Sequence, residues 1–539
     1  MQLRRVEIIK YRNFKNLVID FEKSDFPNVF SIASKNGGGK STLLQFIFIL
    51  LSCFMDKNKH KYIKNLLKEF SDSDTANNIE LVTFEIDDNS KVYHLDFTIT
   101  SPNWNDIDFN LYLDVKDLHQ EIEINRIKER KYNKIFALQS VLTEFNRITP
   151  VFKNNFRDVE NIFVELGLGG LYNNLRIEDN QHKVVKDYQK LINQALSNHS
   201  IEPNNINDLE LVYEESKNNL SLLKDNLDKK NIRYINHLNN TSILLLKTDM
   251  SLEGLTQLSN SVFFTAPNTQ VYHFLEPRDK LEVFDSLTSY SSVLDNLKKS
   301  LDNFYTYDFA STDIISKSFQ KASDEDLKSK RKTGTYGTKY DELTNELKDF
   351  LDDKEVIENE DGNQIIFRLK SSKKELFPED LSHGELKKLG IYIWLKYIVE
   401  DNSIVLMDEV DIALHPKWQY ELVDDLTQWS KGSQFLLATH SPQILSSTYY
   451  KNIIKLDNGK VTRYRQPPID RDINAIIVEI MEAPDFPEDL LNLHKEYRKL
   501  VNNRKHKSDE GKALRAEILE YESENSSFFQ DINMDLELL

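Results

Sequence analysis

One short run of this chain has the residue types and spacing of a loop that binds phosphate. Ser34-Lys35-Asn36-Gly37-Gly38-Gly39-Lys40-Ser41-Thr42 follows a predicted strand and opens a predicted helix. Glycines there let backbone N–H groups approach phosphate oxygens at a helix end that favours anions. We expect Lys40 to reach the β- and γ-phosphates and the Ser41 hydroxyl to bind Mg²⁺. The usual pattern begins with glycine, so Ser34 predicts an altered hold on phosphate.

Two carboxylates end a second predicted strand. Residues 403–409 (SIVLMDE) are apolar up to Asp408 and Glu409, and ligands of α/β sheets bind at such carboxyl ends. We expect Asp408 to hold Mg²⁺ through water, and Glu409 to orient and polarise the water that attacks the γ-phosphate. A strand ending in acids is a weak signal alone. Together with the glycine loop it predicts nucleotide hydrolysis.

Two further segments add groups to this predicted site. One is a helix start that forms a capping box, made of Ser382, His383, Gly384 and Glu385. By itself such a box marks only a helix N-terminus, but an N-terminus with a bare glycine also suits a γ-phosphate held by another subunit. The other is His440, which follows the predicted strand 435–438 and could hydrogen-bond the γ-phosphate and the attacking water.

A parallel sheet with covering helices would bring these segments together, so we expect an α/β fold. The pattern predicts hairpins over 6–22 and 80–98, strands at 28–34, 261–266 and 365–369, and a buried helix over 40–55. The glycine-containing, basic run 328–337 predicts a loop.

The chain divides into five predicted parts. They are an N-terminal lobe with the glycine loop, a mainly helical insertion, a strand followed by a helical subdomain, a lobe with the remaining motifs, and a helical C-terminal extension: 1–100, 101–258, 259–380, 381–468 and 469–539. In the insertion, apolar or small residues recur every three or four positions, which predicts the seam of a helical hairpin or short coiled coil: Leu209, Tyr213, Ser216, Leu220, Leu223 and Leu227.

Composition narrows the function classes. The 539 residues predict three or four domains. A net charge of −18 excludes a uniformly basic nucleic-acid coat. The one cysteine, Cys53, permits no internal disulfide, which fits a reducing compartment. The N-terminus does not resemble a signal peptide, and the longest apolar run, 43–55, is shorter than the roughly 20 residues of a membrane span. We therefore expect a cytoplasmic protein.

At this point the motifs resemble a known superfamily. SKNGGGKST, LSHGE, IVLMDEVDIALHP and ATHSPQ occur in the order of the Walker A, signature, Walker B with D-loop, and switch-histidine elements of ABC-type ATPases. The pattern over 408–416 is similar to the RecF, Rad50 and OLD branch. The resemblance implies ATP and Mg²⁺ as ligands, two subunits joined across the nucleotide, and Asp411 in the D-loop. For the glutamine that senses Mg²⁺ we expect Gln270, with Gln139 as the rival. Arg12 is either near the nucleotide or a plain surface residue.

A closer resemblance is to the ATPases of Septu and retron-associated defence systems, the PtuA family. It is carried by KNGGGKSTLLQFIFILLSC, by APNTQ, and by residues 471–477 with Glu482-Ala483-Pro484. It implies an antiphage complex with an HNH nuclease of the PtuB kind and, in retron versions, a reverse transcriptase with its msDNA. It also implies a homodimer or higher even oligomer. We expect no nuclease site in this chain, because residues 446–539 lack the acidic pattern of a Toprim domain, and we expect the extension to dock a partner.

Other functions remain open at this stage. One rival is a DNA-repair ATPase of the RecF or Rad50 sort, and another is a scaffold that binds ATP and hardly hydrolyses it, which Ser34 favours. Three basic clusters could touch nucleic acid or an acidic protein: 57–64, 328–332 and 495–507.

Overall fold

The structure of the chain is a computed structural model. The structure describes residues 1–22, 27–35, 37–70, 78–88, 90–105, 107–145, 190, 204–275, 297, 299–307, 310–348, 350–351, 353–358, 365–457, 459–464, 467, 472–484 and 486–538. These form two compact units, one made of Met1–Ile99 with Tyr234–Leu539 and one of Thr100–Arg233. Each unit is described by itself.

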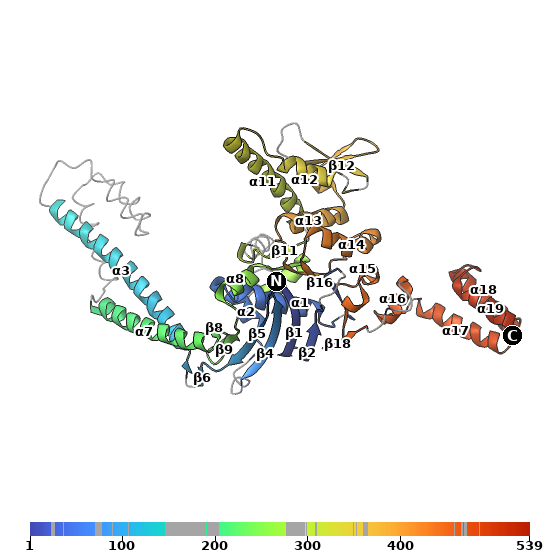
Figure 1. The fold of residues 1–539 in the computed structure, drawn as a ribbon, viewed down its shortest axis with the longest axis horizontal. Helices are drawn as coiled ribbons and strands as arrows, with labels where there is room; N and C mark the ends of the chain where they lie inside the picture. Colours follow the sequence, from blue (N-terminus) through green and yellow to red (C-terminus); the bar gives the residue numbers. More distant parts are fainter. Residues whose placement is uncertain are drawn as a thin grey trace. The chain divides into compact units, whose positions relative to one another are not determined.

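A seven-stranded sheet carries the predicted motifs at its strand ends (Figure 1). Its order is β11-β10-β15-β16-β3-β17-β18, and all neighbours are parallel except the last pair. The strands are β3 (Val29–Ala33), β10 (Val262–Ala266), β11 (Phe304–Thr306), β15 (Ile404–Asp408), β16 (Gln434–Ala438), β17 (Ile453–Asp457) and β18 (Lys460–Arg463). Because Asp408 pairs with Ala438 and Ala438 pairs with Ile32, the carboxyl ends of β15, β16 and β3 lie side by side.

A second sheet is built around antiparallel hairpins. Its six strands follow the order β2-β1-β4-β5-β9-β8, with β1 (Gln2–Tyr11), β2 (Phe14–Asp20), β4 (Ile79–Asp87), β5 (Val92–Thr100), β8 (Ile232–His237) and β9 (Ile243–Lys247). Gln434 at the start of β16 joins this sheet to the first, because its side-chain amide both accepts from the backbone N–H of Leu3 and donates to its carbonyl, each at 2.8 Å.

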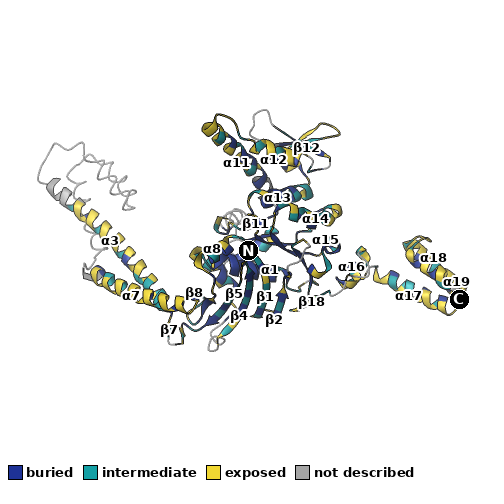
Figure 2. Cartoon of the chain, in the orientation of Figure 1, coloured by how far each residue is buried: buried dark blue, intermediate teal, exposed yellow. Residues whose placement is uncertain are grey.

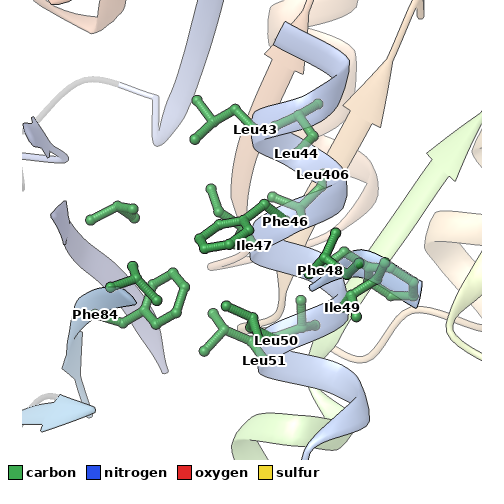
Figure 3. Close-up of a cluster of buried hydrophobic side chains, with 14 of the residues drawn as sticks. Leu43, Leu44, Phe46, Ile47, Phe48, Ile49, Leu50, Leu51, Phe84 and Leu406 are labelled. Atoms are coloured by element: carbon green, nitrogen blue, oxygen red, sulfur yellow. The ribbon is translucent and has the colours of Figure 1, made fainter. Parts of the chain in front are cut away.

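Helix α1 (Lys40–Cys53) fills the space between the two sheets (Figure 3). Every residue from Leu43 to Cys53 is buried, as expected for a helix that is apolar on all sides. The Phe48 ring contacts those of Phe264, Phe274 and Phe304. Burial raises the pKa of the Cys53 thiol to about 12. The N-terminal half of the first unit also contains η1 (Lys57–Lys59), α2 (His60–Leu66), α8 (Leu252–Asn260) and η2 (Asn268–Phe274).

The opposite face of the parallel sheet has its own hydrophobic core. Alternate residues such as Val405 and Met407 face it, whereas Ile404 and Leu406 face α1, so the sheet is covered on both sides. The covering elements include α11 (Ala310–Thr333), α12 (Lys339–Leu347), α13 (His383–Tyr397), α14 (Pro416–Trp429), α15 (Pro442–Ser447) and the small sheet of β12 (Lys354–Glu358), β13 (Ile365–Leu369) and β14 (Glu375–Leu376). The short helices η3 (Pro378–Asp380) and η4 (Tyr450–Asn452) precede α13 and β17.

The prediction of a loop over 328–337 is wrong for the first half of this segment. Helix α11 continues to Thr333, and Gly334 ends it with a φ of +84°. Basic side chains in the last turn, Lys330, Arg331 and Lys332, are compatible with the negative end of a helix.

The predicted C-terminal extension is helical, as expected. It contains α16 (Ile473–Glu479), α17 (Glu488–Asn502), α18 (Asp509–Tyr521) and α19 (Ser527–Leu538). The last three helices share a small core of their own around Tyr497 and Phe529, whereas Ile476 and Ile480 from α16 pack against β3, α15 and β17.

The second unit is a helical hairpin of α3 (Leu111–Phe145) and α7 (Asn204–Lys229), preceded by the short strands β6 (Asn103–Trp104) and β7 (Ile107–Asp108). Figure 2 shows long exposed faces on both helices. The six predicted seam residues of α7 are all buried or half-buried, and an Arg126–Glu210 ion pair of 2.8 Å joins the helices. The predicted insertion ends at 258, but this unit ends at Arg233, because β8 and β9 pair into the sheet of the first unit.

The predicted α/β fold with a helical insertion and a helical C-terminal extension is confirmed. Among the described residues, no helix combines the length and apolar character needed to cross a membrane.

Candidate nucleotide site

The glycine loop connects β3 to α1, as its sequence predicts. Gly39 precedes the first residue of α1 with a φ of +96°, and no side chain caps the helix. A Cβ there would lie 2.8 Å from the Phe14 ring, so both its backbone angle and its packing require glycine. The first N–H groups of α1 are therefore available to an anion. Asn36 of the predicted loop lies outside the described residues.

Ser34 occupies the position where the usual motif has glycine. Its φ is outside the left-handed region, so this position does not need glycine for its backbone. The Ser34 hydroxyl donates to the Lys35 carbonyl at 2.8 Å and accepts from Lys40 at 3.0 Å. In this conformation, the Ser34 hydroxyl accepts a hydrogen bond from Lys40, the lysine that is expected to bind phosphate.

Lys40 and His440 meet at this edge of the sheet. The Lys40 Nζ and His440 Nε2 are 2.8 Å apart, although 400 positions separate the two residues. Burial lowers the pKa of Lys40, against the opposing effect of Asp408, Asp411 and Glu409. Burial and then Lys40 lower the pKa of His440. A neutral imidazole whose Nε2 accepts from the ammonium fits these directions, with the ring proton on Nδ1.

Asp408 is the most deeply buried acid of the site. Asp408 is fully buried. Neither of its carboxylate oxygens meets the usual distance and angle limits of a hydrogen bond with any described residue. Burial raises its pKa to about 6, with Glu409 and Asp411 acting in the same direction and Ser41 and Lys40 acting against it. Buried carboxylates without partners are rare in native proteins, so this one fits a cation.

The residues present fit Mg²⁺ of the kind that accompanies a nucleotide. Ser41 and Asp408 supply oxygen atoms, which Mg²⁺ prefers, and such sites use few protein ligands with phosphate and water completing the shell. Among the described residues no group of three or more His, Cys, Asp or Glu side chains could hold a metal by itself. The site would thus bind its metal together with the nucleotide.

Glu409 sits on a strained turn directly after β15. Its φ is +51°, unusual for a residue with a Cβ, and its N–H donates to the Ala438 carbonyl at 3.0 Å. Lys387, a buried residue of α13, donates to the carbonyls of Glu409 (3.1 Å) and Ile412 (2.7 Å). Its ammonium also lies 3.9 Å from the centre of the Tyr307 ring. The ammonium of Lys387 therefore stabilises the turn that carries Glu409, the predicted general base.

Asp411 lies in the same turn. It accepts from the Thr439 hydroxyl at 2.7 Å, which ties it to the segment that carries His440. Gln419 donates to the Asp411 carbonyl at 3.2 Å and accepts from Ser441 at 2.7 Å. The predicted D-loop and the predicted switch segment thus form one hydrogen-bonded structure.

The segment 382–385 begins α13 with the predicted capping box. Ser382 accepts from the Glu385 N–H at 3.4 Å, and the Ser382 N–H donates to the Glu385 carboxylate at 2.9 Å. Lys354 of β12 forms an ion pair with Glu385 as well. Ser382 and His383 are exposed. A Cβ on Gly384 would lie 2.5 Å from the Ala413 carbonyl oxygen, so glycine there permits α13 to approach the turn after Asp411.

The two candidate glutamines lie in different units. Gln270 is in η2, just after β10, and accepts from the buried Gln45 of α1 at 2.8 Å. Gln45 is one helical turn after Ser41, so Gln270 contacts the helix that the glycine loop opens. Gln139 lies in α3 of the helical unit.

Arg12 has a φ of +48°, its backbone N–H donates to Glu69 at 3.0 Å, and its guanidinium lies over the Tyr11 ring.

The sequence analysis missed three supporting residues. Lys387, Thr439 and Gln45 hold the turn after β15, Asp411 and Gln270, respectively. Gln45 had a signal, since it is a polar residue inside an apolar helix. Lys387 had none, because a lysine on an amphipathic helix is normally exposed.

A family comparison covers much of this site. Residues 170–446, just over half of the chain, match the family described as "AAA domain, putative AbiEii toxin, Type IV TA system". The match includes the capping box of α13, Asp408, Glu409 and His440, and it begins after the glycine loop.

Three curated relatives are similar in sequence. They are the "Retron Ec83 probable ATPase" of Escherichia coli (29% identical over 145 residues, 26% of each chain), the "Retron Vc95 probable ATPase" of Vibrio cholerae (36% over 108 residues, 18% of this chain and 21% of the relative) and the "Septu protein PtuA" of Bacillus mycoides (25% over 189 residues, 32% and 26%). The alignments span about a quarter of each relative's length or less. The resemblance to retron and Septu ATPases is confirmed by these relatives.

Solved structures give a weaker likeness. The Smc head domain of Pyrococcus furiosus bound to part of ScpA aligns with 86% of this chain and 96% of its own, at 14% identity and a TM-score of 0.29. The SMC head domain of Thermotoga maritima aligns with 86% and 100%, at 11% identity and a TM-score of 0.31. TM-scores this low establish no shared fold, so the fold is taken from the strand order described above.

Proposed function

The chain belongs to the family described as AAA domain, putative AbiEii toxin, Type IV TA system, and on that premise we propose that it binds Mg·ATP and hydrolyses it. The observation that carries the proposal is the contact of Lys40, the first residue of α1, with His440, together with the pairing that places the carboxyl ends of β15, β16 and β3 side by side, where Asp408 ends β15. The orphaned carboxylate of Asp408 supports a metal there.

In this mechanism each group of the chain has a separate task. The N–H groups of α1 and Lys40 would hold the phosphates. Ser41 and Asp408 would hold Mg²⁺, which would supply positive charge to offset that of the phosphates. Glu409 orients water and accepts its proton. His440, whose Nε2 contacts Lys40 in this structure, would hydrogen-bond the γ-phosphate once Lys40 turns to the phosphates. Gln270 and Asp411 complete the site from η2 and the turn after β15.

The cellular role that we propose is ATPase of an antiphage defence complex. The names of the retron and Septu relatives support it. By the same analogy, one partner is a second copy of this chain, whose exposed Ser382 and His383 would complete the site. Another is an HNH nuclease of the PtuB kind. In a retron system, a reverse transcriptase with its msDNA would also take part. The exposed lysines of 57–64, 328–332 and 495–507 are available to nucleic acid. These relatives favour defence over DNA repair, and we place the complex in the cytoplasm.

The decisive experiment measures ATP binding and phosphate release by the purified chain with Mg²⁺ and with EDTA. Lys40→Ala should weaken ATP binding by about tenfold or more, the size of one charge-assisted hydrogen bond to phosphate. Lys247→Ala, at an exposed lysine of β9, is the matched control and should bind normally. Equal binding by wild type and Lys40→Ala would refute the proposal.

A scaffold that binds ATP with little hydrolysis is the second candidate. The hydrogen bond between Ser34 and Lys40 favours it, because the serine competes with phosphate for the ammonium. Phosphate release by the wild type separates the two functions: a scaffold would bind ATP and release little phosphate, whereas an ATPase would turn over. If the Ser34 side chain causes slow turnover, Ser34→Gly should raise it.

A further inference from the structure

Glu482 bridges two lysines beside the glycine loop. It follows α16, and its carboxylate pairs with Lys35 at 2.9 Å and with Lys455. Lys35 belongs to the loop, whereas Lys455 lies on β17, where it pairs with Ala33 at the end of β3. A residue of the C-terminal extension therefore contacts the loop directly from one side and the strand beside it from the other.

The backbone holds Glu482 in place. The N–H groups of Met481 and Ala483 donate to the carbonyls of Ile476 and Ile477, each at 3.1 Å, so the chain is fastened to α16 on both sides of Glu482. Glu482 itself has a φ of +53°, a conformation that costs free energy for a residue with a Cβ. The surrounding contacts must fix this conformation, since glycine or asparagine would adopt it more easily.

The charges define what Glu482 does to the loop. Its two lysines, Lys455 first, lower its pKa to about 2, so it is negative at neutral pH. Lys35 is more than half exposed and is free to turn toward a ligand in the loop. ATP brings about four negative charges to the same place, which attract Lys35 and repel a nearby carboxylate.

We propose that Glu482 competes with the nucleotide phosphates for Lys35, so that ATP binding releases Glu482 from the loop. The inference rests on the proposed nucleotide site. Because coupling between two sites is reciprocal, a partner that binds the extension and withdraws Glu482 raises the affinity for ATP. Glu482 is thus a regulatory contact between the extension and the phosphate loop.

The test is a comparison of Kd values for ATP and AMP in the full-length chain. Glu482→Gln should bind ATP roughly threefold more tightly, the size of one exposed ion pair, and AMP unchanged, because AMP lacks the β- and γ-phosphates. Glu479→Gln is the matched control: it removes the same charge from an exposed residue at the end of the same helix and should bind ATP as wild type does. Lys35→Ala should weaken ATP binding, and Glu482→Gln should add less on that background than alone.

Each outcome decides the inference. Equal changes for ATP and AMP would indicate a purely structural role of Glu482 and overturn it, as would unchanged or weaker ATP binding by Glu482→Gln, or full additivity with Lys35→Ala. Melting temperatures of the variants show whether they fold. If the wild-type chain binds no ATP, the proposed function itself fails, which is a separate result.

Discussion

Two helices of the core have N-termini that could bind an anion. They differ in whether a side chain already caps the N–H groups of the first turn. Helix α1 has Gly39 as its N-terminal neighbour, no side-chain cap and no acid in the first turn. Helix α13 is closed by the reciprocal hydrogen bonds of Ser382 and Glu385, and Lys354 pairs with Glu385.

The difference separates a binding site from a stable helix end. At α1 the N–H groups have no partner from a capping side chain, and the carboxylate of Asp408 is buried with no hydrogen bond of standard geometry to the part of the chain that the structure describes. We therefore expect a ligand to complete that region. At α13 the capping box satisfies the N-terminus of the helix, so a γ-phosphate from the proposed second subunit would have to compete with that box. Nucleotide should therefore be held mainly by α1, while α13 engages late and reversibly.

The largest expected effect tests the α1 side. Glu409→Gln should lower phosphate release by about 10²-fold or more, the size of a lost general base, with ATP binding retained. Steady-state turnover and ATP titration check it. Glu400→Gln, at an exposed acid before β15, is the control. Unchanged turnover in Glu409→Gln would remove this residue from the mechanism.

The next effect concerns stability without nucleotide. Because the folded pKa of Asp408 is about 6 against an ordinary 3.8, the folded state retains this proton to higher pH than the unfolded state. Asp408 therefore makes stability fall as pH rises from about 4 to 6, and above pH 6 its ionised form costs about 3 kcal/mol.

Asp408→Asn should accordingly stabilise the nucleotide-free chain at pH 7.5 by up to that amount and have a smaller effect at pH 5, while abolishing Mg²⁺-dependent turnover. Thermal and denaturant unfolding of both proteins at the two pH values provide the measurement. A destabilised Asp408→Asn at pH 7.5 would contradict the assignment of a buried carboxylate whose ionised form costs stability without a ligand.

A mixing experiment asks whether α13 acts in a second subunit. Ser382→Arg places a bulky side chain at the N-terminus of α13 and should lower turnover about tenfold, as should Lys40→Ala. Mixed dimers of the two variants contain one site with both defects and one intact site, so combining the two variants should raise turnover above that of either variant alone. No recovery, with exchange of subunits demonstrated, would place both groups in one chain's site or in none.

The smallest effect is on the α13 cap itself. Ser382→Ala removes the side-chain acceptor for the Glu385 N–H and should lower the free energy of unfolding by about 1 kcal/mol, opposite in sign to Asp408→Asn. Denaturant unfolding at pH 7.5 measures it. Ser372→Ala, in the exposed turn before β14, is a suitable control. Stabilisation by Ser382→Ala would mean that the capping box does not stabilise α13.

Much of this arrangement could be predicted from local sequence. The glycine loop, Asp408 and His440 each follow a short apolar run, and parallel strands bring such ends together regardless of the intervening chain length. The heptad-like spacing from Leu209 to Leu227 gave the seam of α7 for a similar reason, since it depends on helical periodicity alone.

What could not be predicted depends on tertiary contacts. The contact of Gln45 with Gln270 and the carbonyl bonds of Lys387 join segments whose proximity no local pattern encodes. The strands β8 and β9 lie in the predicted insertion, yet pair with a sheet begun at the N-terminus. In α11 the basic run suggested a loop, but a helix tolerates basic residues in its last turn and ends only at Gly334.

The burial of Cys53 within α1 has a practical consequence. Its thiol, the single one in the sequence, is inaccessible and remains protonated at neutral pH, and thiolate is the reactive form. A cysteine introduced at an exposed position, for example in place of Leu222 on α7 or Tyr521 on α18, would therefore react alone with a maleimide dye. Fluorescence transfer between two such labels could follow the distance between the hairpin of α3 and α7 and the C-terminal extension as nucleotide is added. The native cysteine would not have to be removed first.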